Sequence, residues 1–177
     1  MPMLLSADGG AMEKSRKIAL SGVLLALACG FSYLESIIPL PLPLGAKPGL
    51  ASVVIMFSIL RLDLKTTLSL TLLKSVFVLS IRGFTAFLLS LSGGLLSLFI
   101  MLILFSFTRS SIVLTSVFGA VSHNIGQLLM VGAFYCQSFF PVLAYAPIMT
   151  VTGCITGAFT GSLIGLTLKA LDKHHSD

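Results

Sequence analysis

Charged residues are scarce in this chain of 177 residues. Only 10% of the residues are Asp, Glu, Lys or Arg, whereas 56% are hydrophobic, and the mean hydropathy is +1.06. A soluble domain carries about 25% charged residues, so a soluble fold of this length would have too few charges to cover its surface. The composition therefore predicts an all-α integral membrane protein, because helices of about 20 apolar residues cross a bilayer.

Acidic residues are the scarcest of the charged groups. The chain has six of them: Asp8, Glu13, Glu35, Asp63, Asp172 and Asp177. Prenyl chain elongation by trans-type synthases needs clustered aspartates that hold Mg²⁺ against a diphosphate, and no two of these acids lie within reach on one helix face. A nucleophile–base set is also missing, so we predict no catalytic residue. We predict no cofactor and no metal site either, because the His and Cys residues lack metal-ligand spacing.

Hydrophobic runs divide the chain into a tail at 1–17, a membrane domain at 18–168 and a tail at 169–177. Within the membrane domain we predict a bundle of about six transmembrane helices, at 18–38, 50–60, 66–82, 84–107, 111–135 and 145–168. The second run is short on its own. It either extends into the flanking loop or is partly re-entrant.

Basic residues predict the orientation of this bundle, because short cytoplasmic loops carry the excess of Lys and Arg. With the N-terminus inside, only Lys47 and Arg82 lie on the outer side and Lys74 lies within a helix. The other basic residues are all cytoplasmic: Lys14, Arg16, Lys17, Arg61, Lys65, Arg109, Lys169 and Lys173. We therefore predict a multi-pass protein of the plasma membrane with both termini in the cytoplasm. The net charge of +5 then reflects topology and contact with anionic lipid headgroups, and we predict no nucleic-acid partner.

Small residues predict where the helices pack, since helices in lipid associate through close approach of their backbones. The last predicted helix carries four glycines at a spacing of four, nearly in one line: Gly153, Gly157, Gly161 and Gly165. We predict that this face packs against another helix, with docking of a partner protein as the alternative. The first helix carries a similar strip that includes Gly22 and Ala26, which serves either internal packing or docking of a partner subunit.

Polar residues inside the predicted helices need an explanation, because ionisable groups are costly in a bilayer and mark functional sites. Lys74 and Arg82 share a polar stripe on the third helix, and His123, Asn124 and Gln127 form a second stripe on the fifth. Stripes that face inward line an internal cavity. In the alternative interpretation, Arg82 extends to the headgroups, Lys74 pairs with a helix-end carbonyl and His123 forms a hydrogen bond across helices.

The outer end of the first helix carries Tyr33 and Glu35, followed by a proline-rich segment at 39–49 that contains Lys47. Alternating prolines prefer an extended polyproline conformation, so the segment is either a lid over a pocket that opens outward or a rigid connector. Together these features predict a binding site for a small, partly anionic substrate, formed by Tyr33, Glu35, Lys47, Lys74, Arg82, His123, Asn124 and Gln127.

The order of these motifs also resembles a known family. The motifs are Tyr33-x-Glu35-x-x-x-Pro39, Lys47-x-Gly49-Leu50-Ala51, Ser92-Gly93-Gly94 and His123-Asn124-x-Gly126-Gln127-Leu128, and they cover nearly the whole chain. In combination they resemble the Gx transporter family, also labelled heptaprenyl diphosphate synthase component I. That family is similar to the substrate-binding S components of energy-coupling factor (ECF) vitamin importers.

The resemblance implies an S-component-like bundle that captures a vitamin-like or flavin-like molecule in an outward pocket. It also implies partners, namely the ECF transmembrane coupling subunit and its ATPases. S components commonly meet the coupling subunit through Ala-x-x-x-Ala on the first helix, where this chain has Gly22-x-x-x-Ala26. The alternative function is that of a membrane accessory subunit for prenyl diphosphate or quinone biosynthesis.

Overall fold

The computed structural model describes residues 7–37, 50–107, 111–135 and 140–174, and the regular structure in them is entirely α-helical. The helices are α1 (Ala7–Ile37), α2 (Ser52–Arg61), α3 (Leu64–Phe107), α4 (Ile112–Tyr135) and α5 (Phe140–His174). Four of these, α1, α3, α4 and α5, are long and apolar enough to cross a membrane. The prediction of an all-α, multi-pass membrane protein is confirmed at this level, but the count of about six spans is not.

The long helix α3 reverses direction at Gly83. The backbone there has φ 81° and ψ −175°, a conformation that is essentially restricted to glycine. The Oγ atoms of Ser75 and Ser90 lie 3.3 Å apart, although fifteen residues of straight helix would separate them by about 22 Å. The two arms of α3 therefore lie antiparallel, and the break falls between the predicted helices 66–82 and 84–107.

Helix ends differ from the prediction mainly in the first and last helices. Helix α1 begins at Ala7, whereas the prediction starts at residue 18. Ala, Met, Glu, Lys and Arg, which favour helix, are frequent at 11–17 and continue it beyond the apolar run. Helix α5 is likewise longer than predicted and contains Pro147. Helix α2 has ten residues, too few to cross a bilayer alone. The proline-rich segment 39–49 lies outside the described residues.

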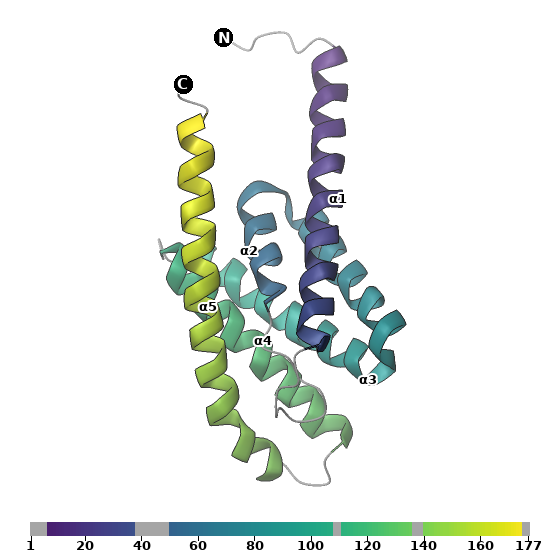
Figure 1. Ribbon diagram of the computed structural model, residues 1–177, viewed down its shortest axis with the longest axis vertical. Coiled ribbons are helices and arrows are strands. Elements are labelled where there is room, and N and C mark those ends of the chain that lie inside the picture. The colour runs from purple at the N-terminus through teal and green to yellow at the C-terminus, as the bar shows by residue number, and fades with distance from the viewer. Residues whose placement is uncertain (1–6, 38–49, 108–110, 136–139, 175–177) are drawn as a thin grey trace.

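Helix α4 occupies the centre of the bundle, packed along both α3 and α5, while α1 and α2 contact α3. Figure 1 shows α1 and α5 as two tall helices on either side of α2. The first turn of α1 and the last turn of α5 lie at the same end of the molecule, which we call the terminal end. The opposite end, where α5 starts and toward which α1 runs, we call the distal end.

Three of the four aligned glycines of α5 lie against α4. A Cβ atom added to Gly157 would lie 2.5 Å from the Cα atom of Val117, and additions at Gly153 and Gly161 would also meet the α4 backbone. Gly165 differs, because nothing lies within 4 Å of its added Cβ. The glycine face thus brings α5 onto α4 along most of its length and leaves the last position open.

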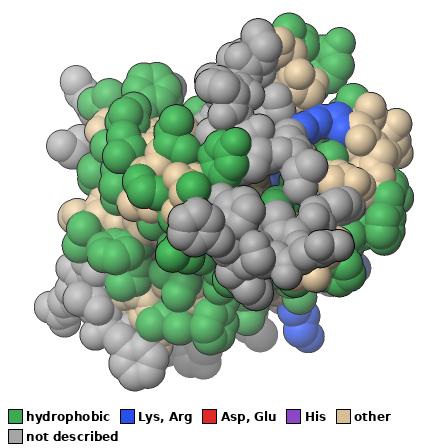
Figure 2. All heavy atoms as spheres, turned by 90° about the horizontal axis from the view of Figure 1, so that it is seen from below, with side chains coloured by type: hydrophobic (Ala, Val, Ile, Leu, Met, Phe, Trp, Pro, Cys, Tyr) green, Lys and Arg blue, Asp and Glu red, His purple; other side chains and the backbone are tan. Residues whose placement is uncertain are grey.

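Side chains are distributed inside out relative to a soluble protein. Leu143 and Phe134 are 69% and 67% exposed, whereas Lys74 is 3% exposed. Seen from the distal end, the described side chains are mainly hydrophobic, with only small areas of Lys or Arg (Figure 2). This arrangement fits a protein whose sides face hydrocarbon, where polar groups must find partners internally.

Candidate functional site

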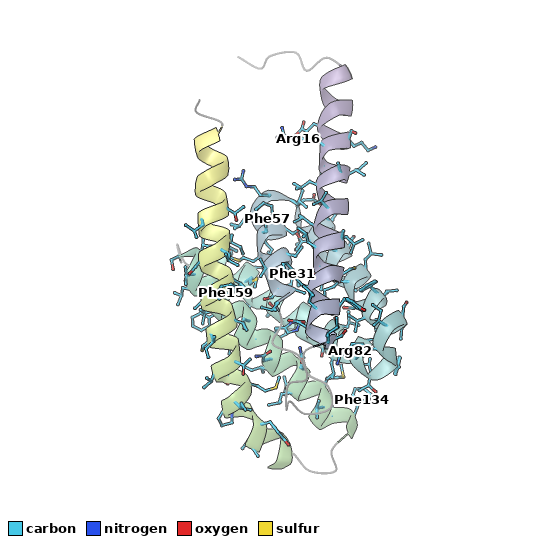
Figure 3. All side chains as sticks on the ribbon, in the orientation of Figure 1. Arg16, Phe31, Phe57, Arg82, Phe134 and Phe159 are labelled. Carbon is cyan, nitrogen blue, oxygen red and sulfur yellow. The ribbon has the colours of Figure 1, made fainter. Side chains whose placement is uncertain are left out.

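A polar cavity of about 30 Å³ lies between α1, both arms of α3 and α4. It is lined by Ser32, Glu35, Lys74, Val78, Arg82, Ala86, Leu89, Ser90, His123 and Gln127. Figure 3 shows Arg82 near the last turn of α1, toward the distal end. Because one water needs roughly 10–15 Å³ of such space, the cavity in this conformation holds about two water molecules.

Glu35 closes the cavity on the α1 side. Its side chain is buried, and its carboxylate accepts a hydrogen bond from the backbone N–H of Leu50, just before α2. Its negative charge also interacts with Lys74 and Arg82. Glu35 therefore connects the end of α1 to the start of the α2 segment and to the first arm of α3.

Lys74 and Arg82 supply the positive charge of the cavity. Both lie on the first arm of α3, eight residues apart, which places them on one face of the helix. Removing a charged group from water costs several kcal/mol, so the buried ammonium group of Lys74 needs the Glu35 carboxylate and the polar lining around it. Two cations and one carboxylate leave the lining with a net charge of +1, counting histidine as neutral.

Helix α4 contributes His123 and Gln127, which are one turn apart. Gly93 on the second arm of α3 allows α4 to approach closely, since a Cβ added to Gly93 would lie 2.8 Å from the His123 carbonyl oxygen. His123 is buried, and its Nδ1 atom has no hydrogen-bond partner among the described residues. The ring packs against α3, because a Cβ added to Gly93 would lie 2.9 Å from both Nδ1 and Cε1 of His123.

The structure brings together five of the eight residues that the sequence predicts for the site: Glu35, Lys74, Arg82, His123 and Gln127. Tyr33 is half exposed on α1 and does not line the cavity, because neighbouring helical residues point about 100° apart. The Nδ2 atom of Asn124 donates a hydrogen bond of 2.7 Å to the Met149 carbonyl oxygen, so Asn124 connects α4 to α5. Lys47 lies outside the described residues.

Two serines that line the cavity were not predicted from the sequence. Ser32 comes from α1 and Ser90 from the second arm of α3. A lone serine in an apolar helix carries no spacing pattern that distinguishes it from a serine bonded to its own backbone. The position of Ser90 becomes meaningful only because Gly83 folds its arm back against Ser75.

A separate charged cluster lies at the turn between α2 and α3. Lys17 of α1 forms an ion pair with Asp63, and Thr66 donates its N–H and its hydroxyl to the same carboxylate at 3.2 and 2.9 Å. These interactions, with Lys17 the largest, lower the pKa of Asp63 below its usual range. Asp63 therefore caps the start of α3 and ties it to α1.

The fold and the cavity define a helical membrane protein with a polar site inside the bundle. A family model described as heptaprenyl diphosphate synthase component I matches residues 24–167. The match spans most of the chain, and the protein belongs to the heptaprenyl diphosphate synthase component I family, as its motifs indicate. Comparisons with curated proteins and with solved structures give no match.

Proposed function

We propose that this protein is a membrane-embedded binding component that holds a small anionic molecule in the cavity between α1, α3 and α4. The proposal rests on one observation, the concentration of Lys74, Arg82, His123 and Gln127 at a single buried place. Ionisable groups in a membrane are costly and are retained for function. A lining with net positive charge attracts an anionic group.

In this proposal each part of the lining has its own role. Lys74 and Arg82 bind carboxylate or phosphate oxygens, and His123 and Gln127 form hydrogen bonds to the polar part of the molecule. Val78 and Leu89 contact an apolar part. A vitamin-like or flavin-like molecule combines these three kinds of surface.

Binding such a molecule requires the cavity to open. Ligand pockets measure about 300–1,000 Å³, whereas this cavity measures about 30 Å³, so the proposal takes the described conformation as a closed state. Glu35 lies where α1 meets both Leu50 and the cations of α3. Release of Glu35 from these contacts is the step that we propose for opening.

We further propose that the protein serves as the substrate-binding component of an ECF-type importer. In this role the two arms of α3 cross the membrane separately, both termini are cytoplasmic and the cavity opens outward. The chain has no Gly-x-x-x-x-Gly-Lys-Ser/Thr loop, so the proposal assigns ATP use to separate subunits. The small-residue face of α1 supports docking of a coupling subunit, because Cβ atoms added to Gly22 and Gly30 would meet nothing within 4 Å.

A second candidate function is that of a membrane accessory subunit for prenyl diphosphate biosynthesis. The family match favours this function. The same cavity then holds the phosphate end of a prenyl diphosphate, with Lys74 and Arg82 as its partners.

Mass spectrometry of small molecules extracted from the purified protein tests both functions. The wild type is compared with a Lys74→Met/Arg82→Gln double variant and with Lys65→Met, which removes an exposed cation outside the cavity. We expect an anionic compound in the wild type and in the control, and its loss from the double variant. A vitamin-like compound supports the importer and a prenyl diphosphate the accessory subunit, whereas identical extracts from all three proteins contradict the site.

A further inference from the structure

A larger hollow lies on the side of the bundle between α1 and α5, separate from the polar cavity. This apolar groove has a volume of about 410 Å³. Its lining comes from α1, α2 and α5: Leu20, Val23, Leu24, Leu27, Phe31, Val53, Val54, Phe57, Leu163, Ile164 and Thr167. Figure 1 shows α2 between the two tall helices, so α1 and α5 form the walls and α2 the floor.

Toward the terminal end the apolar groove continues into a charged cleft of about 490 Å³. Leu20 lines both hollows. The charged cleft is lined by Glu13, Arg16, Lys17, Leu20, Arg61, Leu62 and Asp63, so three cations and two carboxylates give it a net charge of +1. Figure 3 shows Arg16 on the side of α1 that faces α5, with Phe57 and Phe31 lower in the same gap.

We propose that the charged cleft and the apolar groove form one binding site for an anionic phospholipid, with its phosphate group in the cleft and one acyl chain in the groove. An apolar cavity of roughly 150 Å³ holds benzene, so by the same ratio the groove holds about 16 carbon atoms, which is one acyl chain. The net charge of +1 matches a headgroup with a single negative charge. Arg16 and Arg61 carry the planar guanidinium groups that suit phosphate oxygens.

An isoprenoid diphosphate fits this site less well. Its head carries more negative charge than one phosphodiester, and the carboxylates of Glu13 and Asp63 in the charged cleft oppose that excess. A seven-unit prenyl chain also has about twice as many carbon atoms as the groove holds. Both the charge and the volume therefore favour the phospholipid.

The chain contains no tryptophan, so one introduced tryptophan reports directly on the groove. Phe57→Trp places the reporter on the groove lining, and Leu27→Trp is a second reporter at a half-exposed lining position. Phe118→Trp, at an exposed position of α4 outside the groove, is the control. Each variant is reconstituted in phosphatidylcholine bilayers that contain a small fraction of a lipid with brominated acyl chains, which quench tryptophan on contact.

We expect brominated phosphatidylglycerol to quench the two groove reporters more strongly than brominated phosphatidylcholine, and both lipids to quench the control equally. Arg16→Gln and Arg61→Gln should each lower this preference about fivefold, the value of one basic residue near an anionic headgroup. Lys14→Gln, which removes an α1 cation outside the charged cleft, should leave the preference unchanged.

Three results would overturn the proposal. Equal quenching of both groove reporters by the two lipids means that the cleft does not select a headgroup. Absence of quenching at both reporters means that protein, either a second copy or a partner, fills the groove. Displacement of the brominated lipid by a prenyl diphosphate at lower concentration than by phosphatidylglycerol assigns the site to an isoprenoid.

Discussion

Gly157 on α5 tests how the last two helices pack. A Cβ atom at this position would lie 2.5 Å from the Cα atom of Val117 and 2.9 Å from the carbonyl oxygen of Ser116. Both are backbone atoms, so Gly157→Ala cannot be accommodated by rotation of a side chain and must separate α5 from α4. Gly165→Ala is the matched control, because nothing lies within 4 Å of its added Cβ.

Comparing the two variants isolates the effect of helix packing on the free energy of unfolding. Each gains about 1 kcal/mol of helix propensity, and this gain cancels in the comparison. Overpacking costs about 1–3 kcal/mol. Separation of the helices also weakens the 2.8 Å hydrogen bond between Ser116 and Thr160, which in a membrane protein is worth about 0.6 kcal/mol. We therefore expect Gly157→Ala to be less stable than Gly165→Ala by about 1.5–3.5 kcal/mol.

Equilibrium unfolding in mixed micelles with increasing sodium dodecyl sulfate measures this difference. The two variants are unfolded side by side with the wild type, and helical content is followed by circular dichroism. Equal unfolding free energies for the two variants would show that the glycine face of α5 does not pack on α4.

Three further predictions concern the backbone, the ion pair and the topology. Gly83→Ala should lower the unfolding free energy by about 1–3 kcal/mol, because φ 81° is strained for alanine. Gly30→Ala, in the regular helix α1, is the control, and a loss of stability no larger than in this control would contradict the prediction. Lys17 lowers the pKa of Asp63, so the pair stabilises the fold above the ordinary carboxyl pKa and that stability is lost as the pH falls through the lowered value. Asp63→Asn should remove this acid dependence from the unfolding midpoint. In the predicted orientation Gln137, between the predicted helices 111–135 and 145–168 and outside the described residues, is extracellular, and Asp63 is cytoplasmic. In a cysteine-free background, an impermeant thiol reagent on intact cells should therefore label Gln137→Cys and spare Asp63→Cys, and the reverse pattern would refute this orientation.

Hydropathy predicts a helix of this protein well where polar residues end the apolar run at both helix ends. The prediction 111–135 differs from α4 by one residue, because polar residues end the apolar run on both sides. Hydropathy fails at 7–17, where the chain is helical although it has no continuous apolar run. The break between the predicted helices 66–82 and 84–107 falls at Gly83, as the structure has it, but the antiparallel arrangement of the two arms is seen only in the structure.

The cost of polar groups in lipid predicts part of the site. Lys74, Arg82 and His123 line the cavity because their stripes face inward, as the energetic argument requires. A polar stripe in the sequence identifies the inward face of a helix only to within about one residue per turn. It therefore cannot distinguish His123, which lines the cavity, from Asn124, which bonds to α5. The neighbouring residues on other helices decide which of the two side chains faces the cavity, and a single sequence does not show which residues are neighbours.

Ligand occupancy in Lys74→Met, measured together with stability, tests the central claim most directly. Methionine keeps a flexible apolar side chain and removes the buried charge. We predict that the anionic compound extracted from the wild type falls about tenfold or more in the variant, the value of a hydrogen bond to a charged group. The variant stays folded but is less stable, because the buried Glu35 then keeps only Arg82 as a cationic neighbour among the described residues. Unchanged occupancy with lower stability would contradict the account and leave Lys74 as a structural partner of Glu35.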